Sequence, residues 1–298
     1  TIVLESMNYP YYAIYKNNWL NHCEEQINSK INRIQSKFNK KKHYNSKKIY
    51  LDSRNPTIPK NSFLQHFYGV EVKVRKSTFN PKEAILMDFR VDQSNGIHFI
   101  YLLPFSKNHA LIESTMFTKS VKEKRWYLSS IKKYLDQNYN VNKFKIIREE
   151  FGMIPMEQLR SSSHGYPGIG ANGNAIRISS GYAFSYIQKQ VKQLSALLKD
   201  NYERENYNLI IPNPHKKFDI FLDKIFVDVL KHHPDKAPEL FLKLVSTLNG
   251  DQMARFMSGA SSFIIYIKII YSMPKYIFLY SFFRIFFQLF KSEYNVRT

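Results

Sequence analysis

The sequence contains a single cysteine, Cys23, among 298 residues. One thiol cannot form a disulfide framework, and it cannot supply a cysteine-based zinc site, so we expect no metal centre. Glycine (10 residues) and proline (12 residues) are also scarce, which excludes a collagen-like or linker-like chain. Residue 1 is threonine, and no signal-peptide pattern follows it, so we expect the sequence to begin partway into a longer protein. The length and the 44% of hydrophobic residues suffice for a sizeable core.

Acidic residues are few compared with basic ones. The 44 Lys and Arg residues exceed the 24 Asp and Glu residues by 20, which gives a formal net charge of +20. Such a charge indicates a nucleic acid or an anionic membrane surface as partner, and a biased base composition is an equally good explanation. The densest basic cluster, Lys40–Lys42 with Lys47 and Lys48, accompanies no zinc-finger, basic-zipper or ribonucleoprotein motif. We therefore expect no nucleic-acid partner.

Long charge-free hydrophobic runs are absent as well. Residues 263–290 are dense in Phe, Ile, Tyr and Leu, but Lys268, Pro274, Lys275 and Arg284 interrupt them before the roughly 20 residues of a membrane span are reached. A helical pair lying in the membrane interface is the interpretation that we favour. A buried helical hairpin is the alternative.

Apolar alternation predicts a mostly antiparallel sheet, because the runs are separated by typical turn residues such as Ser94-Asn95-Gly96. Helical periodicity predicts helices over 19–34, 119–140 and 182–199, and over most of 218–290. The predicted strands are 9–15, 49–51, 65–74, 84–91, 97–103, 110–117 and 144–156.

The densest glycine segment is Gly165 to Gly173. Glycines allow backbone N–H groups to approach an anion, and a helix is predicted beyond this loop. The loop is not a dinucleotide-binding fingerprint, because no clear strand leads into it and no acidic residue follows at the required distance. An ordinary connecting loop is the alternative.

Two acidic residues stand alone in apolar strands, Asp88 in Leu86-Met87-Asp88-Phe89 and Glu113 in Ala110 to Phe117. A carboxyl group in an apolar pocket acquires a raised pKa and can serve as a general acid near neutral pH. The alternative for each is a position that faces solvent on a half-exposed strand.

Several motifs together resemble the lycopene cyclases of carotenoid biosynthesis, specifically the β-cyclases. The most specific part is Met87-Asp88-Phe89-Arg90, followed by Phe99 to Ser106 and then Leu111-Ile112-Glu113-Ser114-Thr115. Further similarity lies in Asp52-Ser53-Arg54, in Glu149 to Met156, and in Ile169 to Gly173 with Ser179 to Tyr182. The similarity covers most of the chain and weakens before residue 45 and after about residue 260.

The resemblance implies an acid-catalysed, non-redox cyclisation of the ψ end groups of lycopene into β-ionone rings. It places Glu113 as the catalytic acid, with Asp88 supporting the pocket. It also implies reduced FAD, with NAD(P)H as the reductant of the flavin, and a protein located in the cytoplasm and attached peripherally to a membrane surface. Ser114 stands where the family often has a second acid, which puts a paired-carboxylate mechanism in doubt. Phe99 and Tyr101 share a strand face and are candidates for cation–π contacts. The residues matched to flavin contacts are Gly170, Ala171, Gly173, Gly181, Asp52 and Arg54.

The expected fold is α+β or α/β, with the remainder of a Rossmann-type FAD-binding domain, an antiparallel substrate domain and a helical C-terminal part. The family's βαβ unit with its G-x-G-x-x-G motif would precede residue 1, so we expect this chain alone not to bind FAD tightly. Two rival functions remain open, a geranylgeranyl reductase-like flavoprotein oxidoreductase and a non-enzymatic membrane-surface binder. The expected domains are 1–60 (partial FAD-binding), 61–160 (catalytic sheet), 161–200 (second flavin loop and helix) and 201–298 (helical, apolar and membrane-associating).

Overall fold

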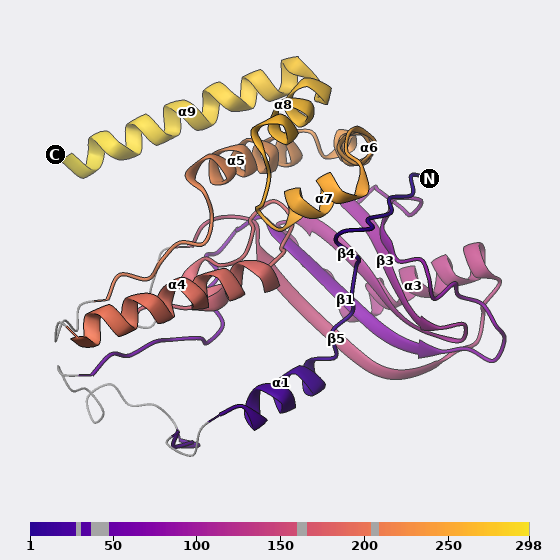
Figure 1. Cartoon of the computed structure of the whole chain (residues 1–298). Helices are drawn as coiled ribbons and strands as arrows, with labels where there is room; N and C mark the ends of the chain where they lie inside the picture. The colour runs from indigo at the N-terminus through magenta and orange to yellow at the C-terminus, as the bar shows by residue number, and fades with distance from the viewer. Residues whose placement is uncertain (28–30, 37–47, 160–165, 204–208, 298) are drawn as a thin grey trace.

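The structure is a computed structural model that describes residues 1–27, 31–36, 48–159, 166–203 and 209–297 (Figure 1). Its centre is a five-stranded sheet in the order β2-β3-β4-β1-β5, in which every neighbouring pair is antiparallel. The predicted antiparallel sheet is therefore confirmed. Its strands are β1 (Leu64–Lys73), β2 (Ile85–Asp88), β3 (Ile97–Ser106), β4 (His109–Thr118) and β5 (Lys145–Pro155).

One face of the sheet, here called the α3 face, is covered by helix α3 (Lys124–Tyr139). Alternate strand residues such as Val70, Ile100 and Ile112 are fully buried against Tyr127 and Ile131 of this helix. The helix ends at Asn140, whose left-handed backbone conformation stops it. This packing accounts for the predicted helix at 119–140 and forms the first hydrophobic core.

The opposite face, here called the site face, is covered at one end by the C-terminal helices. Phe99 and Phe117 of the sheet pack there with Val229, Leu240 and Phe241 to form a second core. The predicted helices at 182–199 and over most of 218–290 are confirmed. These helices are α4 (Phe184–Glu203), α5 (Lys217–His232), η2 (Pro234–Lys236), α6 (Ala237–Thr247), α7 (Gly250–Met257), α8 (Phe263–Ser272) and α9 (Lys275–Arg297).

The N-terminal segment departs from its prediction. Residues 9–15 have no strand partner among the described residues, and the helix α1 spans only Lys16–Glu25 instead of 19–34. No residue of α1 is buried, and the contact of the Trp19 ring with Phe184 of α4 lies in its first turn, so little tertiary packing stabilises a longer helix. The segment instead crosses the site face, where the Tyr11 hydroxyl lies 3.0 Å from that of Tyr101 (Figure 1).

The parallel sheet of a Rossmann-type domain is not found among the described residues. The predicted strand at 49–51 is reduced to one parallel bridge between Asp52 and Gly168. Most of the basic cluster, residues 40–42 and 47, lies outside the described residues. The proposed domain boundaries stay predictions.

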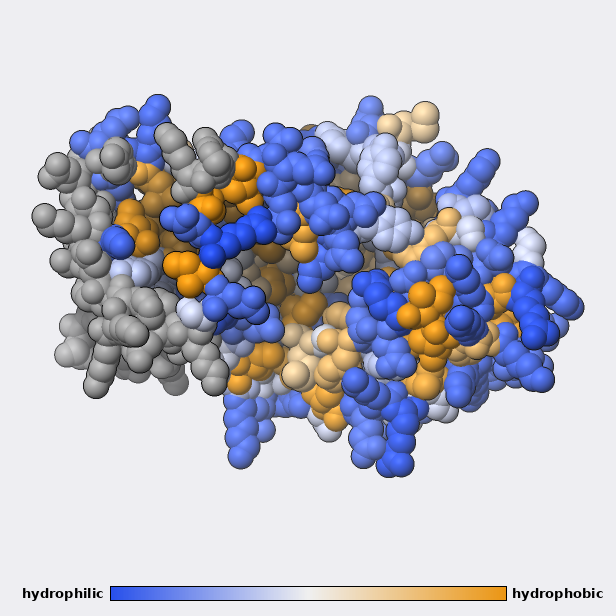
Figure 2. Space-filling view, turned by 90° about the horizontal axis from the view of Figure 1, so that it is seen from below, coloured by the Kyte–Doolittle hydropathy of each residue, from blue (hydrophilic) through white to orange (hydrophobic). Residues whose placement is uncertain are grey.

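No single described helix is long and apolar enough to cross a membrane. Helices α8 and α9 pass the same test only as a pair, and they are bent by 117° at their junction. Large apolar side chains on this pair are exposed, including Phe263 (73%) and Tyr276 (85%). The pair is therefore not the buried helical hairpin of the alternative interpretation. The side of the molecule away from these helices is mostly hydrophilic, with apolar residues lining a hollow near its middle (Figure 2).

Candidate active site

The site face carries a pair of glutamates from two strands that do not touch each other. Glu113 of β4 and Glu150 of β5 both lie opposite Gly69 of the strand between them. A Cβ atom on Gly69 would lie 2.9 Å from Cγ of Glu113 and 3.0 Å from Cγ of Glu150. The missing side chain therefore leaves the space in which the two carboxyl groups meet, and Glu113 is hydrogen-bonded to Glu150 there.

The environment of Glu113 favours its neutral form. Burial, followed by the hydrogen bond and the charge repulsion from Glu150, raises the pKa of Glu113 to about 8. Arg148 opposes this shift, and its guanidinium lies 3.6 Å from Glu150. The side chain of Glu150 is 36% exposed, so it is the better hydrated of the two. Glu113 therefore keeps its proton at neutral pH, which is the state that a general acid requires.

Tyr101 lies beside this pair because it is the β3 residue opposite Glu113. Burial raises the pKa of the Tyr101 hydroxyl, with further contributions from Tyr11 and the two glutamates, so it stays neutral. Phe99 shares the face of Tyr101, as predicted, but its ring is buried between Phe89 and Phe117. Tyr101 is thus the aromatic ring of this strand beside the acid.

The structure does not bring Asp88 to Glu113. Asp88 pairs with Ile100 and lies on the α3 face, where its carboxylate accepts hydrogen bonds from Tyr134 (2.8 Å) and Arg90 (2.7 Å). Burial alone would raise the pKa of Asp88, but these hydrogen bonds outweigh it and lower the pKa. The prediction that Asp88 supports the catalytic pocket is therefore wrong, because Asp88 anchors β2 to α3 on the opposite face. The solvent-facing alternative is also wrong, because Asp88 is buried.

Strand alternation also explains Ser114. Its side chain points to the α3 face, where it lies 2.8 Å from Nε2 of His98. An acid at position 114 would thus point away from Glu113. The partner of Glu113 is Glu150, which sequence reasoning missed although the motif Glu149 to Met156 contained it. Finding this partner requires the strand register, which places both glutamates opposite Gly69.

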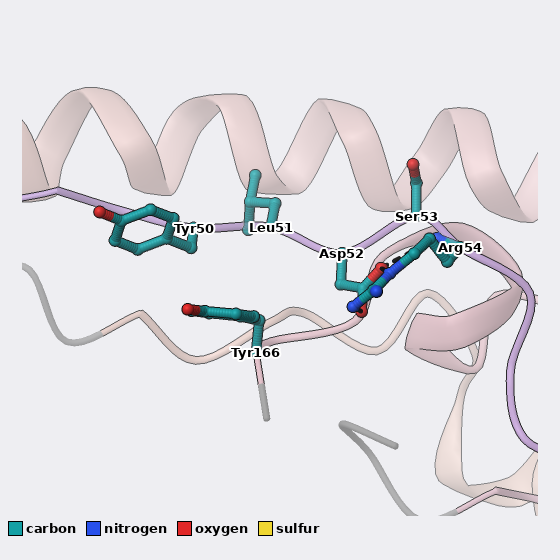
Figure 3. Close-up of a pocket in the computed structure, with 6 residues that line it drawn as sticks. All are labelled: Tyr50, Leu51, Asp52, Ser53, Arg54 and Tyr166. Atoms are coloured by element: carbon teal, nitrogen blue, oxygen red, sulfur yellow. Dashed lines mark hydrogen bonds and ion pairs between the residues drawn. The ribbon is translucent and has the colours of Figure 1, made fainter. Parts of the chain in front are cut away.

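Of the predicted cofactor residues, Asp52 and Arg54 meet the glycine loop, and Gly181 lies elsewhere. Asp52 and Gly168 form the parallel bridge, and backbone hydrogen bonds of 2.9 Å link Asp52 to Pro167 and Ile169. The Arg54 guanidinium folds back onto the Asp52 carboxylate at 2.7 and 2.8 Å. A pocket of about 240 Å³ opens here, and Figure 3 shows the Tyr166 ring on the side to which the Asp52 side chain points. The ring of Tyr50 lies 5.2 Å from that of Tyr166. Leu51 and Ser53 point the other way in the same view.

The glycine loop is a tight turn. Gly168, Gly170 and Gly173 have the spacing G-x-G-x-x-G. Gly170 and Gly173 are the ends of the 3₁₀ turn η1 (Gly170–Gly173), and no helix starts at the loop because α4 begins only at Phe184, so this is not a dinucleotide-binding fingerprint. A Cβ on Gly173 would lie only 2.4 Å from the carbonyl oxygen of Gly168. The two backbone segments approach each other so closely that only glycine fits at position 173. Ala171 lies inside η1 and accepts a hydrogen bond from Asn174.

Gly170 and Gly181 have left-handed backbone conformations, with φ of 62° and 70°. A Cβ on Gly170 would meet no atom within 4 Å, so the turn leaves an open side. Gly181 instead lies against Gln65 at the end of the sheet and apart from the pocket residues. The pocket and the open turn suit one part of a flavin, namely a planar ring beside tyrosines and an arginine, and the volume is smaller than that of a pocket for a whole cofactor.

A buried ion pair holds the segment after the loop. Arg177 is 3% exposed and donates to Asp223 of α5 at 2.9 Å, to the carbonyl of Phe256 at 2.6 Å, and lies over the Phe256 ring. Ser179 donates to the same carboxylate at 2.8 Å. Sequence reasoning missed this pair because its members are 46 residues apart.

Comparisons with known proteins agree with the motifs. The family model described as "Lycopene cyclase protein" matches residues 46–279, most of the chain. The lycopene beta-cyclase of a Paracoccus species is 44% identical over 55 residues, which are 18% of this chain and 14% of that relative.

Solved structures resemble the chain weakly. A geranylgeranyl bacteriochlorophyll reductase-like protein of Thermoplasma acidophilum has a TM-score of 0.44 at 9% identity, over 74% of this chain and 54% of that one. A flavin-dependent brominase has a TM-score of 0.36 at 10% identity, over 69% and 53%. The chain thus spans about half the length of these structures, and likenesses of this size carry no argument about function.

Proposed function

Because this chain belongs to the lycopene cyclase family, we propose that it closes the ψ end groups of lycopene into β-ionone rings by acid catalysis without net redox change. The observation that carries the proposal is the Glu113 carboxyl group that meets Glu150 opposite Gly69 on the site face, where burial raises its pKa to about 8. The family match supports a carotenoid substrate, and the match to a lycopene beta-cyclase, although short, supports a β-ring product.

In the proposed reaction, the Glu113 carboxyl donates its proton to the terminal double bond of the end group. A new C–H bond forms, and the resulting tertiary cation is attacked by the internal double bond, which closes the ring. Loss of a ring proton to the carboxylate restores Glu113 and leaves a β-ionone ring. Atoms and electrons balance, since one proton enters and one leaves.

The chain's own residues would contribute in two ways. The Tyr101 ring beside Glu113 offers a π face to the cation, worth about 1–2 kcal/mol when desolvated. The pocket of Asp52, Arg54, Tyr50 and Tyr166, with the open turn at Gly170, would hold part of FAD. Reduced FAD, with NAD(P)H as its reductant, would supply an electron-rich ring near the cation.

We also propose that the protein works at the membrane surface, on its cytoplasmic side, because the substrate is a hydrocarbon. The exposed apolar side chains of α8 and α9 lie next to basic groups such as Lys275, whose ammonium lies 4.9 Å from the Tyr271 ring centre. This combination suits an interfacial helix pair on anionic lipids. The hydrophilic side seen in Figure 2 would face water.

Replacing Glu113 by Gln tests the proposal. The test is made on the chain fused behind a dinucleotide-binding unit. The amide cannot donate a proton to an alkene, so cyclic product should fall at least a hundredfold, while the flavin absorbance of the fusion stays unchanged. Glu149→Gln, a change on the same motif but on the opposite face, is the matched control. Full activity of Glu113→Gln would refute the proposed acid.

The rival oxidoreductase function predicts a different chemistry. A reductase acting on isoprenoid double bonds would consume NAD(P)H in proportion to product and add two hydrogens per double bond. The proposed cyclase uses NAD(P)H only to reduce the flavin and leaves the substrate mass unchanged. Stoichiometric NAD(P)H consumption would favour the rival.

A further inference from the structure

We infer that Glu150 is the positioning residue that holds the proton on Glu113, across the space that Gly69 leaves between the two strands. The inference rests on the proposed function, in which Glu113 is the acid. It goes beyond that function because it assigns a role to a second carboxyl group and to a glycine on a third strand.

The geometry is the first support. Gly69 is the β1 residue that faces both glutamates, and any larger residue would enter the space where their side chains meet. Two carboxyl groups that meet in a partly buried place cannot both ionise without strong repulsion, so they share one proton through a hydrogen bond. The register of three strands therefore creates a carboxylic acid–carboxylate pair.

The asymmetry of the pair is the second support. Arg148 lies on the Glu150 side, at 3.6 Å, and Glu150 is the more exposed of the two carboxyl groups. A nearby cation and water both stabilise a carboxylate, so this geometry places the proton of the pair on Glu113. The Arg148 guanidinium also forms an ion pair with Glu71 at 3.2 Å, and the Glu71 carboxylate lies 2.7 Å from Nε2 of His109.

Among the described residues, the other hydroxyl groups beside the pair are those of Tyr101 and Tyr11, which are much weaker acids than a carboxyl group. Tyr101 from β3 faces Glu113, and Tyr11 of the N-terminal segment bonds to Tyr101. The pKa of Tyr101 is raised by its burial, so its hydroxyl stays neutral throughout the range in which Glu113 titrates. Loss of the Glu113 proton is thus governed by its burial, by Glu150 and by Arg148.

The test is an infrared titration of the carboxylic acid C=O band in the purified full chain, from about pH 5 to about pH 10. Among the described carboxyl groups with a resolved shift, Glu113 is the one whose pKa is raised, so the band that persists above pH 6 belongs to it. We expect the wild-type band to vanish with a midpoint of about 8 and Glu113→Gln to lack it.

Glu150→Gln should move that midpoint down by at least one pH unit, because its amide donates to the Glu113 carboxylate and no longer repels it. Gly69→Ala should move it in the same direction by separating the carboxyl groups. Glu149→Gln should leave it in place, and circular dichroism checks that each variant is folded. An unchanged midpoint in folded Glu150→Gln, or a wild-type protein without the band, overturns the inference.

The infrared titration needs neither lycopene nor flavin. A failure of this inference can therefore be distinguished from a failure of the proposed function. If the function is also correct, the alkaline limit of cyclase activity in Glu150→Gln should shift down with the infrared midpoint. A loss of activity at all pH values with no shift of that limit would assign Glu150 a merely structural role and contradict the inference.

Discussion

At the scale of single residues, the pKa of Glu113 has a consequence for stability. Its pKa rises from the ordinary 4.5 to about 8 on folding, so between these values the folded protein holds a proton that the unfolded chain releases. The contribution of Glu113 to stability is therefore fully present below about pH 4.5 and is lost as the pH rises toward 8.

We therefore expect Glu113→Gln to lose less stability than the wild type when the pH is raised. Between pH 6.5 and 8 the free energy of unfolding of the wild type should fall by up to about 2 kcal/mol more than that of Glu113→Gln, because one pH unit corresponds to about 1.4 kcal/mol for one proton. Urea denaturation at both pH values measures it. The comparison stays above pH 6.5, because burial lowers the pKa of His66 to about 4 and this histidine destabilises the fold in more acidic solution. Parallel losses in both proteins would contradict the raised pKa.

Sequence alone identified Glu113 as an isolated acid in an apolar strand, and the family resemblance gave it a role. Sequence alone could not pair it with Glu150, because that pairing depends on the register of β1 with two different strands. Asp88 carried the same sequence signal as Glu113 and lies on the other face. Alternation defines which residues share a face within one strand, but it does not say which faces of neighbouring strands coincide.

At the scale of elements, the sheet and the long helices were predictable because their hydrophobic periodicity is strong. The N-terminal segment was not, because Tyr9 to Tyr15 has strand-like composition but pairs with no strand among the described residues. The meeting of Asp52 with the glycine loop was anticipated only through the family motifs, since 116 residues separate Asp52 from Gly168.

The segment between η1 and α4 depends on the buried Arg177–Asp223 pair. Arg177→Met leaves Asp223 buried without its cation, so we expect the free energy of unfolding to fall by about 3–5 kcal/mol. Ser179→Ala removes one hydrogen bond to the same carboxylate and should cost only about 1 kcal/mol. Urea denaturation distinguishes them, and equal small losses in the two variants would show that the ion pair does not hold this segment.

At the scale of the whole molecule, the apolar surface of α8 and α9 predicts binding to anionic vesicles. Replacing Phe263 and Phe287 together by Ser should weaken co-sedimentation with phosphatidylglycerol vesicles more than tenfold, since a buried Phe contributes about 1.5–3 kcal/mol. Ile147→Ser, an exposed apolar residue on β5, is the control. Unchanged binding of the double variant would refute the membrane surface, and high salt should weaken binding through the basic residues.

The most direct test of the central claim is the mass of the product formed from lycopene in D₂O, with the flavin kept reduced. The chain is assayed alone and fused behind the dinucleotide-binding unit of a known lycopene cyclase, because the pocket of about 240 Å³ beside Asp52 is smaller than a pocket for a whole cofactor. Acid-catalysed cyclisation predicts β-rings that each carry one deuterium, and no such product from Glu113→Gln. Products with two added hydrogens, or no cyclic product from a folded and flavin-bound protein, would contradict the account.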